Sequence, residues 1–154
     1  MENLEDFFKK RGIKKKVTEF DKSQESEIQS VLETIIKPVF NELANEFSSY
    51  SNVKADYMTS KSAIDAVMEN IEFRVYKMTL LKFSYKPKFI SGDDGISIIG
   101  QFSIPDFYGD KKTYQNTELR KLLSDLDEED IKNDVTNSFI ANSKLDQKNT
   151  VANK

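Results

Sequence analysis

The sequence predicts one α+β domain in which a long kinked amphipathic helix packs on an antiparallel sheet of three or four strands. Apolar residues at spacings of three and four predict the helix over residues 24–50. Alternation of apolar and polar residues predicts strands within 71–104. Helical patterns stand before and after these strands rather than between them, which favours α+β over alternating α/β. The 154 residues suit one domain over 1–142, followed by a polar tail over 143–154.

Composition restricts the chemistry that is open to the chain. It has no cysteine and no histidine, which excludes disulfides, the usual structural zinc sites and nucleophiles paired with histidine. The net charge is −3, so the chain lacks the overall basic excess of most nucleic-acid-binding proteins. No apolar run approaches the roughly 18 residues of a membrane span, and the acidic N-terminus does not resemble a signal peptide. We therefore expect a cytoplasmic protein with no membrane span, cofactor or bound metal.

The N-terminal segment over 1–23 is predicted to hold a short helix and a linker. Asn3 is a good cap for a helix over 3–11, and Gly12 is a good terminator. One face of this helix carries Leu4, Phe7 and Phe8.

Pro38 lies inside the long helix. Proline removes a backbone donor and clashes with the preceding turn, so a kink is expected over residues 34–38. The apolar stripe keeps its phase across the proline, which predicts one bent helix rather than two. The stripe consists of Ile28, Val31, Leu32, Ile35, Ile36, Val39, Phe40, Leu43, Ala44 and Phe47.

The predicted hairpin turns over residues 91–95, where glycine and aspartate are frequent. We expect a register that places Tyr85 opposite Gly100, so that the ring covers the glycine. Pro87 cannot donate a ladder hydrogen bond, so its strand is expected to be an edge there. A slip in the alternation over 75–78 indicates a bulge. The predicted strands are 53–59, 71–75, 81–89 and 96–104, and residues 60–70 fit either a short helix or a loop.

Two short helices are predicted after the strands. Thr117 is the expected cap of the first and Asp127 of the second. The helix dipole favours the acidic residues in the first turn of the second helix. Their apolar positions are Leu119, Leu122, Leu123 and Leu126 in the first, and Ile131, Val135 and Phe139 in the second.

A basic run follows the N-terminal helix, with six basic residues among the eight from Lys9 to Lys16. Such a run contacts phosphates or an anionic lipid surface. The alternative is a solvated segment whose neighbouring phenylalanines dock on the core. The candidate nucleic-acid contacts are Lys9, Lys10, Arg11, Lys14, Lys15 and Lys16.

An aromatic loop precedes the C-terminal helices. Phe107, Tyr108 and Tyr114 lie in a stretch that has neither strand nor helix pattern. Aromatic side chains, tyrosine above all, are enriched in binding surfaces, so these three are candidate partner contacts. The alternative is that the rings close one end of the core.

Other charged groups have ordinary structural explanations. Lysines 82, 86 and 88 share a strand face, where they either receive an acidic partner or protect an edge. Asp93 and Asp94 suit a turn and match no calcium loop. An acidic cluster over 125–134 suits helix capping better than a basic partner.

These patterns identify no catalytic residue and leave three hypotheses open. The first is a small non-catalytic protein-interaction domain that is a subunit, adaptor or inhibitor, with a homodimer as one form. The second is a nucleic-acid-binding accessory protein that uses the basic run over 9–16. The third is a ligand-binding or enzymatic pocket between sheet and helices.

Overall fold

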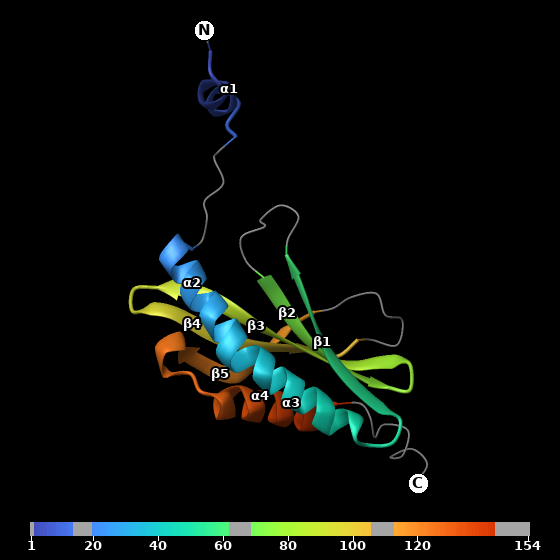
Figure 1. Cartoon of the computed structure of the whole chain (residues 1–154). Helices are drawn as coiled ribbons and strands as arrows, with labels where there is room; N and C mark the ends of the chain where they lie inside the picture. The colour runs from blue at the N-terminus through green and yellow to red at the C-terminus, as the bar shows by residue number, and fades with distance from the viewer. Residues whose placement is uncertain (1, 14–19, 62–68, 106–112, 144–154) are drawn as a thin grey trace.

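The computed structural model describes residues 2–13, 20–61, 69–105 and 113–143. These residues form an antiparallel sheet of five strands in the order β1-β2-β3-β4-β5, so each strand pairs with the next along the chain (Figure 1). The strands are β1 Val53–Lys61, β2 Glu69–Lys77, β3 Leu80–Gly92, β4 Gly95–Ser103 and β5 Gln115–Leu122. The α-helices are α1 Leu4–Lys10, α2 Lys22–Val31, α3 Lys37–Ser48 and α4 Glu128–Asn142.

The predicted long helix is continuous from Lys22 to Ser48, with one irregular turn in its middle. The turn η1, Leu32–Ile36, is π-helical, and the N–H of Lys37 donates to the carbonyl of Leu32, five residues back. Pro38 has no N–H to complete the ordinary ladder, so this wider turn takes up the mismatch. Where a kink was predicted over residues 34–38, the structure has this π-helical turn in an otherwise continuous helix. At the start of the helix, Asp21 and Gln24 form a capping box.

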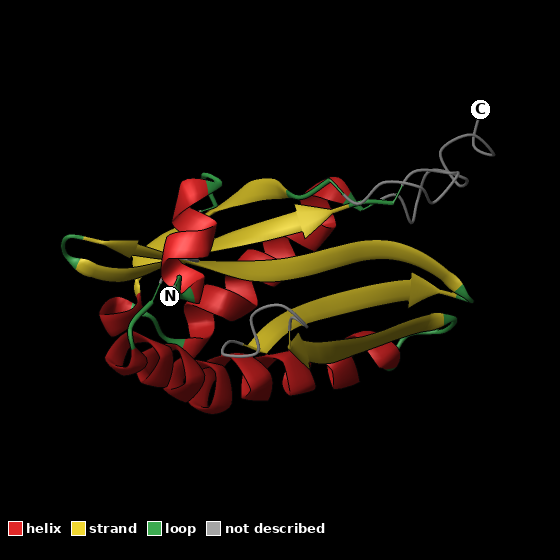
Figure 2. Ribbon diagram, turned by 90° about the horizontal axis from the view of Figure 1, so that it is seen from above, coloured by secondary structure: helices red, strands yellow, loops and turns green. Residues whose placement is uncertain are grey.

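The core lies between the sheet and a layer of helices on one of its faces. The long helix carries fully buried Phe40, whose ring lies 5.3 Å from that of Phe73 on β2. The C-terminal helix α4 lies beside α3, with the rings of Phe47 and Phe139 4.9 Å apart. The strands curve over these helices (Figure 2). The predicted packing of the long helix on the sheet is therefore confirmed, with α4 completing the layer.

The segment predicted as the first C-terminal helix is the fifth strand, and that prediction was wrong. Residues of β5 pair with β4, for example Ile99 with Arg120 and Gln101 with Asn116. The same leucine spacing fits a strand followed by a short 3₁₀ turn, η2 Leu123–Asp125. Leu123 in this turn and Leu126 directly after it are buried. Thr117 consequently caps no helix. The sheet has five strands rather than three or four, and one α-helix follows it, starting at the predicted cap Asp127.

The predicted register of the hairpin is shifted by two residues. Tyr85 pairs with Phe102, and Gly100 pairs with Pro87, because the turn holds two residues between the last pair, Gly92 and Gly95. The other expectations hold. The pairs between β2 and β3 end at Phe73 and Tyr85. At Pro87 the strand β3 therefore pairs on one side, with β4, and its other side is the expected edge. The register shift between Val75 and Tyr76 is the predicted bulge.

Some predictions lie wholly or partly outside the described residues. They concern the choice between helix and loop over 60–70, of which 62–68 are not described, the loop residues 106–112, and the tail from residue 144.

Candidate functional site

The N-terminal helix α1 stands apart from the rest of the described structure (Figure 1). Asn3 caps it through a 2.8 Å hydrogen bond from the N–H of Asp6, and Gly12, at φ +71°, follows its last turn, as predicted. No side chain of α1 is buried. The phenylalanines therefore do not dock on the core, contrary to one of the two interpretations of this segment. Leu4, Phe7 and Phe8 are 74%, 37% and 42% exposed.

The basic residues that are described end this helix and make internal contacts. Lys10 lies 3.2 Å from the carboxylate of Glu2. Arg11 donates to the carbonyl of Phe7 at 3.0 Å, and its guanidinium lies 3.5 Å from the centre of the Phe7 ring. Lys9 is exposed. The remaining candidates, Lys14, Lys15 and Lys16, lie outside the described residues. Lys9, Lys10 and Arg11 therefore lie at the C-terminal end of α1, and their contact with nucleic acid stays a prediction.

Tyr114 lies over the sheet face that the helices leave open. It precedes β5 and is half-buried, with the amino group of Lys86 5.8 Å from the centre of its ring. Burial and the neighbouring Glu72 carboxylate raise the pKa of the Tyr114 hydroxyl. The ring therefore already has partners within the chain. Phe107 and Tyr108, predicted beside it, lie outside the described residues, so their grouping with Tyr114 stays a prediction.

A polar cluster that sequence reasoning missed lies between the sheet and α4. The hydroxyl of buried Tyr85 donates to Asp134, and Thr117 donates to the same carboxylate oxygen at 2.6 Å. Gly100 faces all three, and a Cβ there would clash with each of them. The cluster joins β3, β5 and α4, and it occupies the space that a side chain at Gly100 would fill. The signal in the sequence was Gly100 inside a strand of apolar residues. The sequence reasoning explained this glycine by the Tyr85 ring alone and did not include Thr117 or Asp134.

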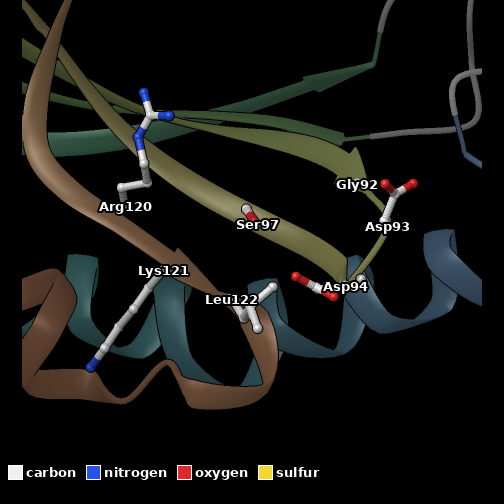
Figure 3. A pocket seen from close by; sticks show the side chains of 8 residues that line it. Gly92, Asp93, Asp94, Ser97, Arg120, Lys121 and Leu122 are labelled. Carbon is white, nitrogen blue, oxygen red and sulfur yellow. The ribbon is translucent and has the colours of Figure 1, made fainter.

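A shallow hollow of about 330 Å³ lies beside the β3–β4 turn. Arg120 and Lys121 point to opposite sides of β5, so their charges do not converge in it (Figure 3). Lys121 pairs with Asp130 at 2.8 Å, and this hydrogen bond raises the pKa of Lys121. Core side chains such as Phe40 and Phe73 lie between the sheet and the helices in the described part of the chain, and the hypothesis of a pocket there stays a prediction. The hollow is lined by Gly92, Asp93, Asp94, Gly95, Ser97, Arg120, Lys121 and Leu122.

The acidic cluster over 125–134 has structural partners. Asp127 and Asp130 form the capping box of α4, and Asp134 belongs to the polar cluster above Gly100. Within the described ranges, no group of three acidic side chains is close enough to hold a metal ion. None of the described helices is long and apolar enough to span a bilayer.

Comparison with known proteins adds no relative: no family model, curated protein or solved structure matches this chain.

Proposed function

We propose that the protein is a non-catalytic protein-interaction domain, a subunit or adaptor, and that α1 is its docking helix. The observation that carries this proposal is the apolar face of α1, which is exposed although the domain has a complete core of its own. Leu4, Phe7 and Phe8 stand at positions i, i+3 and i+4 of one helix. This is the pattern with which an amphipathic helix fills a groove in a partner.

Burial of these side chains supplies the driving force for docking. Apolar surface removed from water contributes roughly 25 cal/mol per Å². Two adjacent phenylalanines therefore offer a large gain to a partner that covers them. Phe7 and Phe8 meet edge to face with their centres 5.5 Å apart, so they present one joined apolar surface.

The brevity of α1 suggests that docking and helix formation are coupled. A helix of 7 residues is marginal in water unless something else supports it. Here the Asn3 cap and the stacking of Arg11 on Phe7 supply part of that support. A groove that holds the apolar face would supply the rest.

A comparison of two double variants tests the proposal. Phe7→Ser with Phe8→Ser removes the apolar face, and Lys9→Ser with Lys10→Ser changes the same number of residues on the polar face. Tagged chains are used to capture partners from a lysate of the source cells, and the partners are quantified by mass spectrometry. We expect the phenylalanine variant to lose its main partner and the polar variant to retain it. Equal capture by both variants contradicts the proposal.

Nucleic-acid binding is the second candidate, because Lys9, Lys10 and Arg11 are adjacent and exposed. A protein that contacts phosphates must bind less tightly as salt rises, since binding releases counterions. Electrophoretic shifts at two salt concentrations test this, with Lys9→Ala, Lys10→Ala and Arg11→Ala combined in one variant. Binding that is unaffected by salt or by the variant rejects this candidate.

A further inference from the structure

The large exposed apolar side chains of the described residues, Met58 apart, lie at two places. One is the N-terminal segment, with Leu4, Phe7, Phe8 and Ile13. The other is the end of the domain where α3 and α4 finish, here called the end patch. It consists of Tyr50, Met78, Leu80 and Ile140, which are 64%, 72%, 63% and 71% exposed.

The end patch is built by three elements that the fold brings to one end. The turn after α3 and the β2–β3 turn lie side by side, because the N–H of Met78 donates to the carbonyl of Asn52 at 2.7 Å. The last turn of α4 lies at the same end, since Phe139 contacts Phe47 near the end of α3. Met78 has φ +59°, a backbone conformation that a methionine adopts at a cost. The hairpin therefore holds an apolar side chain at a tip where glycine would be easier.

We propose that the end patch receives α1 of a second copy of this chain, so that two copies exchange their N-terminal helices. This inference rests on the proposed role of α1 as a docking helix and names its partner. Both surfaces are apolar and exposed, and their charges are complementary. Glu5 and Asp6 lie in the first turn of α1, whereas Lys54 and Lys77 lie beside the patch, at the paired ends of β1 and β2.

Chain length favours exchange over docking within one copy. The helix from Lys22 to Ser48 is about 40 Å long at 1.5 Å per residue, and the patch lies at its far end. The chain between Lys10 and Lys22 spans about 40 Å when it is fully extended. Docking in the same copy would therefore need a completely stretched connection.

An antiparallel pair of copies removes this difficulty. The end patch of each copy then lies near the start of α2 of the other, where the connection to α1 begins. The two contacts are equivalent by a two-fold axis, so the assembly closes as a dimer and does not extend into a filament.

Sedimentation equilibrium over a concentration series tests the exchange. We expect the wild-type protein to dimerise. Phe7→Ser with Phe8→Ser, and separately Met78→Gly with Leu80→Ser, should each raise the dimer dissociation constant by about tenfold or more. Glycine suits the positive φ at residue 78, so the patch variant is expected to fold. Met58→Ser is the control, since Met58 is 43% exposed but lies outside the patch, and it should leave the dimer unchanged.

Charge reversal tests the orientation of the contact. Glu5→Lys with Asp6→Lys should weaken the dimer, as should Lys54→Glu with Lys77→Glu, and all four changes in one chain should restore it. Failure of this restoration contradicts the proposed pairing.

Three outcomes overturn the exchange. If the wild-type chain stays monomeric at all concentrations but captures a different protein through Phe7 and Phe8, the exchange is rejected and the docking role of α1 stands. If it is monomeric and α1 captures nothing, both proposals fail. A monomer that sediments with phosphatidylserine vesicles through α1 replaces the second copy with a lipid surface.

Discussion

At the scale of single residues, the cluster of Tyr85, Thr117 and Asp134 shows how this domain buries polar groups. The Asp134 carboxylate accepts two hydrogen bonds above Gly100, the position with no side chain to exclude it. A half-buried carboxylate without such donors would be less favourable. The cluster therefore links α4 to β3 and β5 through hydrogen bonds, which fix the relative orientation of these elements more closely than apolar contacts would.

Gly100→Ala is predicted to destabilise the fold. The new Cβ would overlap the side-chain oxygens of all three cluster residues, so the cluster must move or break. Overpacking of this kind costs about 1–3 kcal/mol. Urea unfolding measures the loss. Gly92→Ala is the matched control, because its nearest atom would be 3.6 Å away, and this variant should differ from the wild type by less than the Gly100 variant. Equal stability of both variants would contradict the described packing.

Asp134 is predicted to make stability depend on pH. Burial raises the pKa of its carboxyl, although the hydrogen bonds from Thr117 and Tyr85 act in the opposite direction. In the unfolded chain the carboxyl loses its proton near the usual pKa of about 4. Between that pKa and the higher folded pKa, the native state holds more protons, so this contribution to stability is full at lower pH and falls as pH rises.

The substitution Asp134→Asn isolates this effect, because the amide keeps an acceptor oxygen and does not titrate. The free energy of unfolding is measured against pH for both proteins. The wild type should lose stability relative to the variant as pH rises above about 4. A constant difference between the two curves across this window would show that Asp134 does not titrate abnormally.

At the scale of elements, local signals decide the ends of the helices. Asp127 accepts from the N–H of Asp130 at 2.9 Å, and Asp130 accepts in return from the N–H of Asp127 at 3.1 Å. Both groups were visible in the sequence as a cap followed by an acidic turn. The same reasoning failed at Thr117, because pairing with β4 outweighed a local preference for helix.

Asp127→Ala is predicted to cost about 1 kcal/mol, since it leaves the first N–H groups of α4 without their capping acceptor. Thermal or urea unfolding measures the change. Asn137→Ala is the control, because Asn137 is exposed in the middle of the same helix and caps nothing. An equal loss in both variants would mean that the cap contributes nothing specific.

At the scale of the whole molecule, stability and docking are predicted to separate. Phe40 is fully buried among aromatic rings, so Phe40→Ala should destabilise the domain by about 3–5 kcal/mol. Phe7→Ser with Phe8→Ser should change unfolding of the monomeric domain by less than about 0.5 kcal/mol, because α1 buries no side chain. Unfolding at a concentration below dimerisation measures both. A large loss in the α1 variant would show that α1 packs on its own domain.

The sequence by itself determined the α+β class, the long helix with its irregular turn before Pro38, four of the five strands and the caps at Asn3 and Asp127. It also determined that Lys9, Lys10 and Arg11 follow an apolar face on one short helix. These features depend on period, on a missing N–H or on side chains a few residues apart, so local chemistry is sufficient to fix them.

The tertiary structure decided the fifth strand, the register of the hairpin, the cluster above Gly100 and the exposure of α1. Leucines at 119, 122 and 123 suit a helix and a strand equally, and the free edge of β4 makes the choice. A spacing along the chain cannot show which distant residues share a carboxylate or whether a short helix finds a groove in its own domain. Those outcomes depend on contacts between residues far apart in sequence, whose strength is set by the packing of the whole fold.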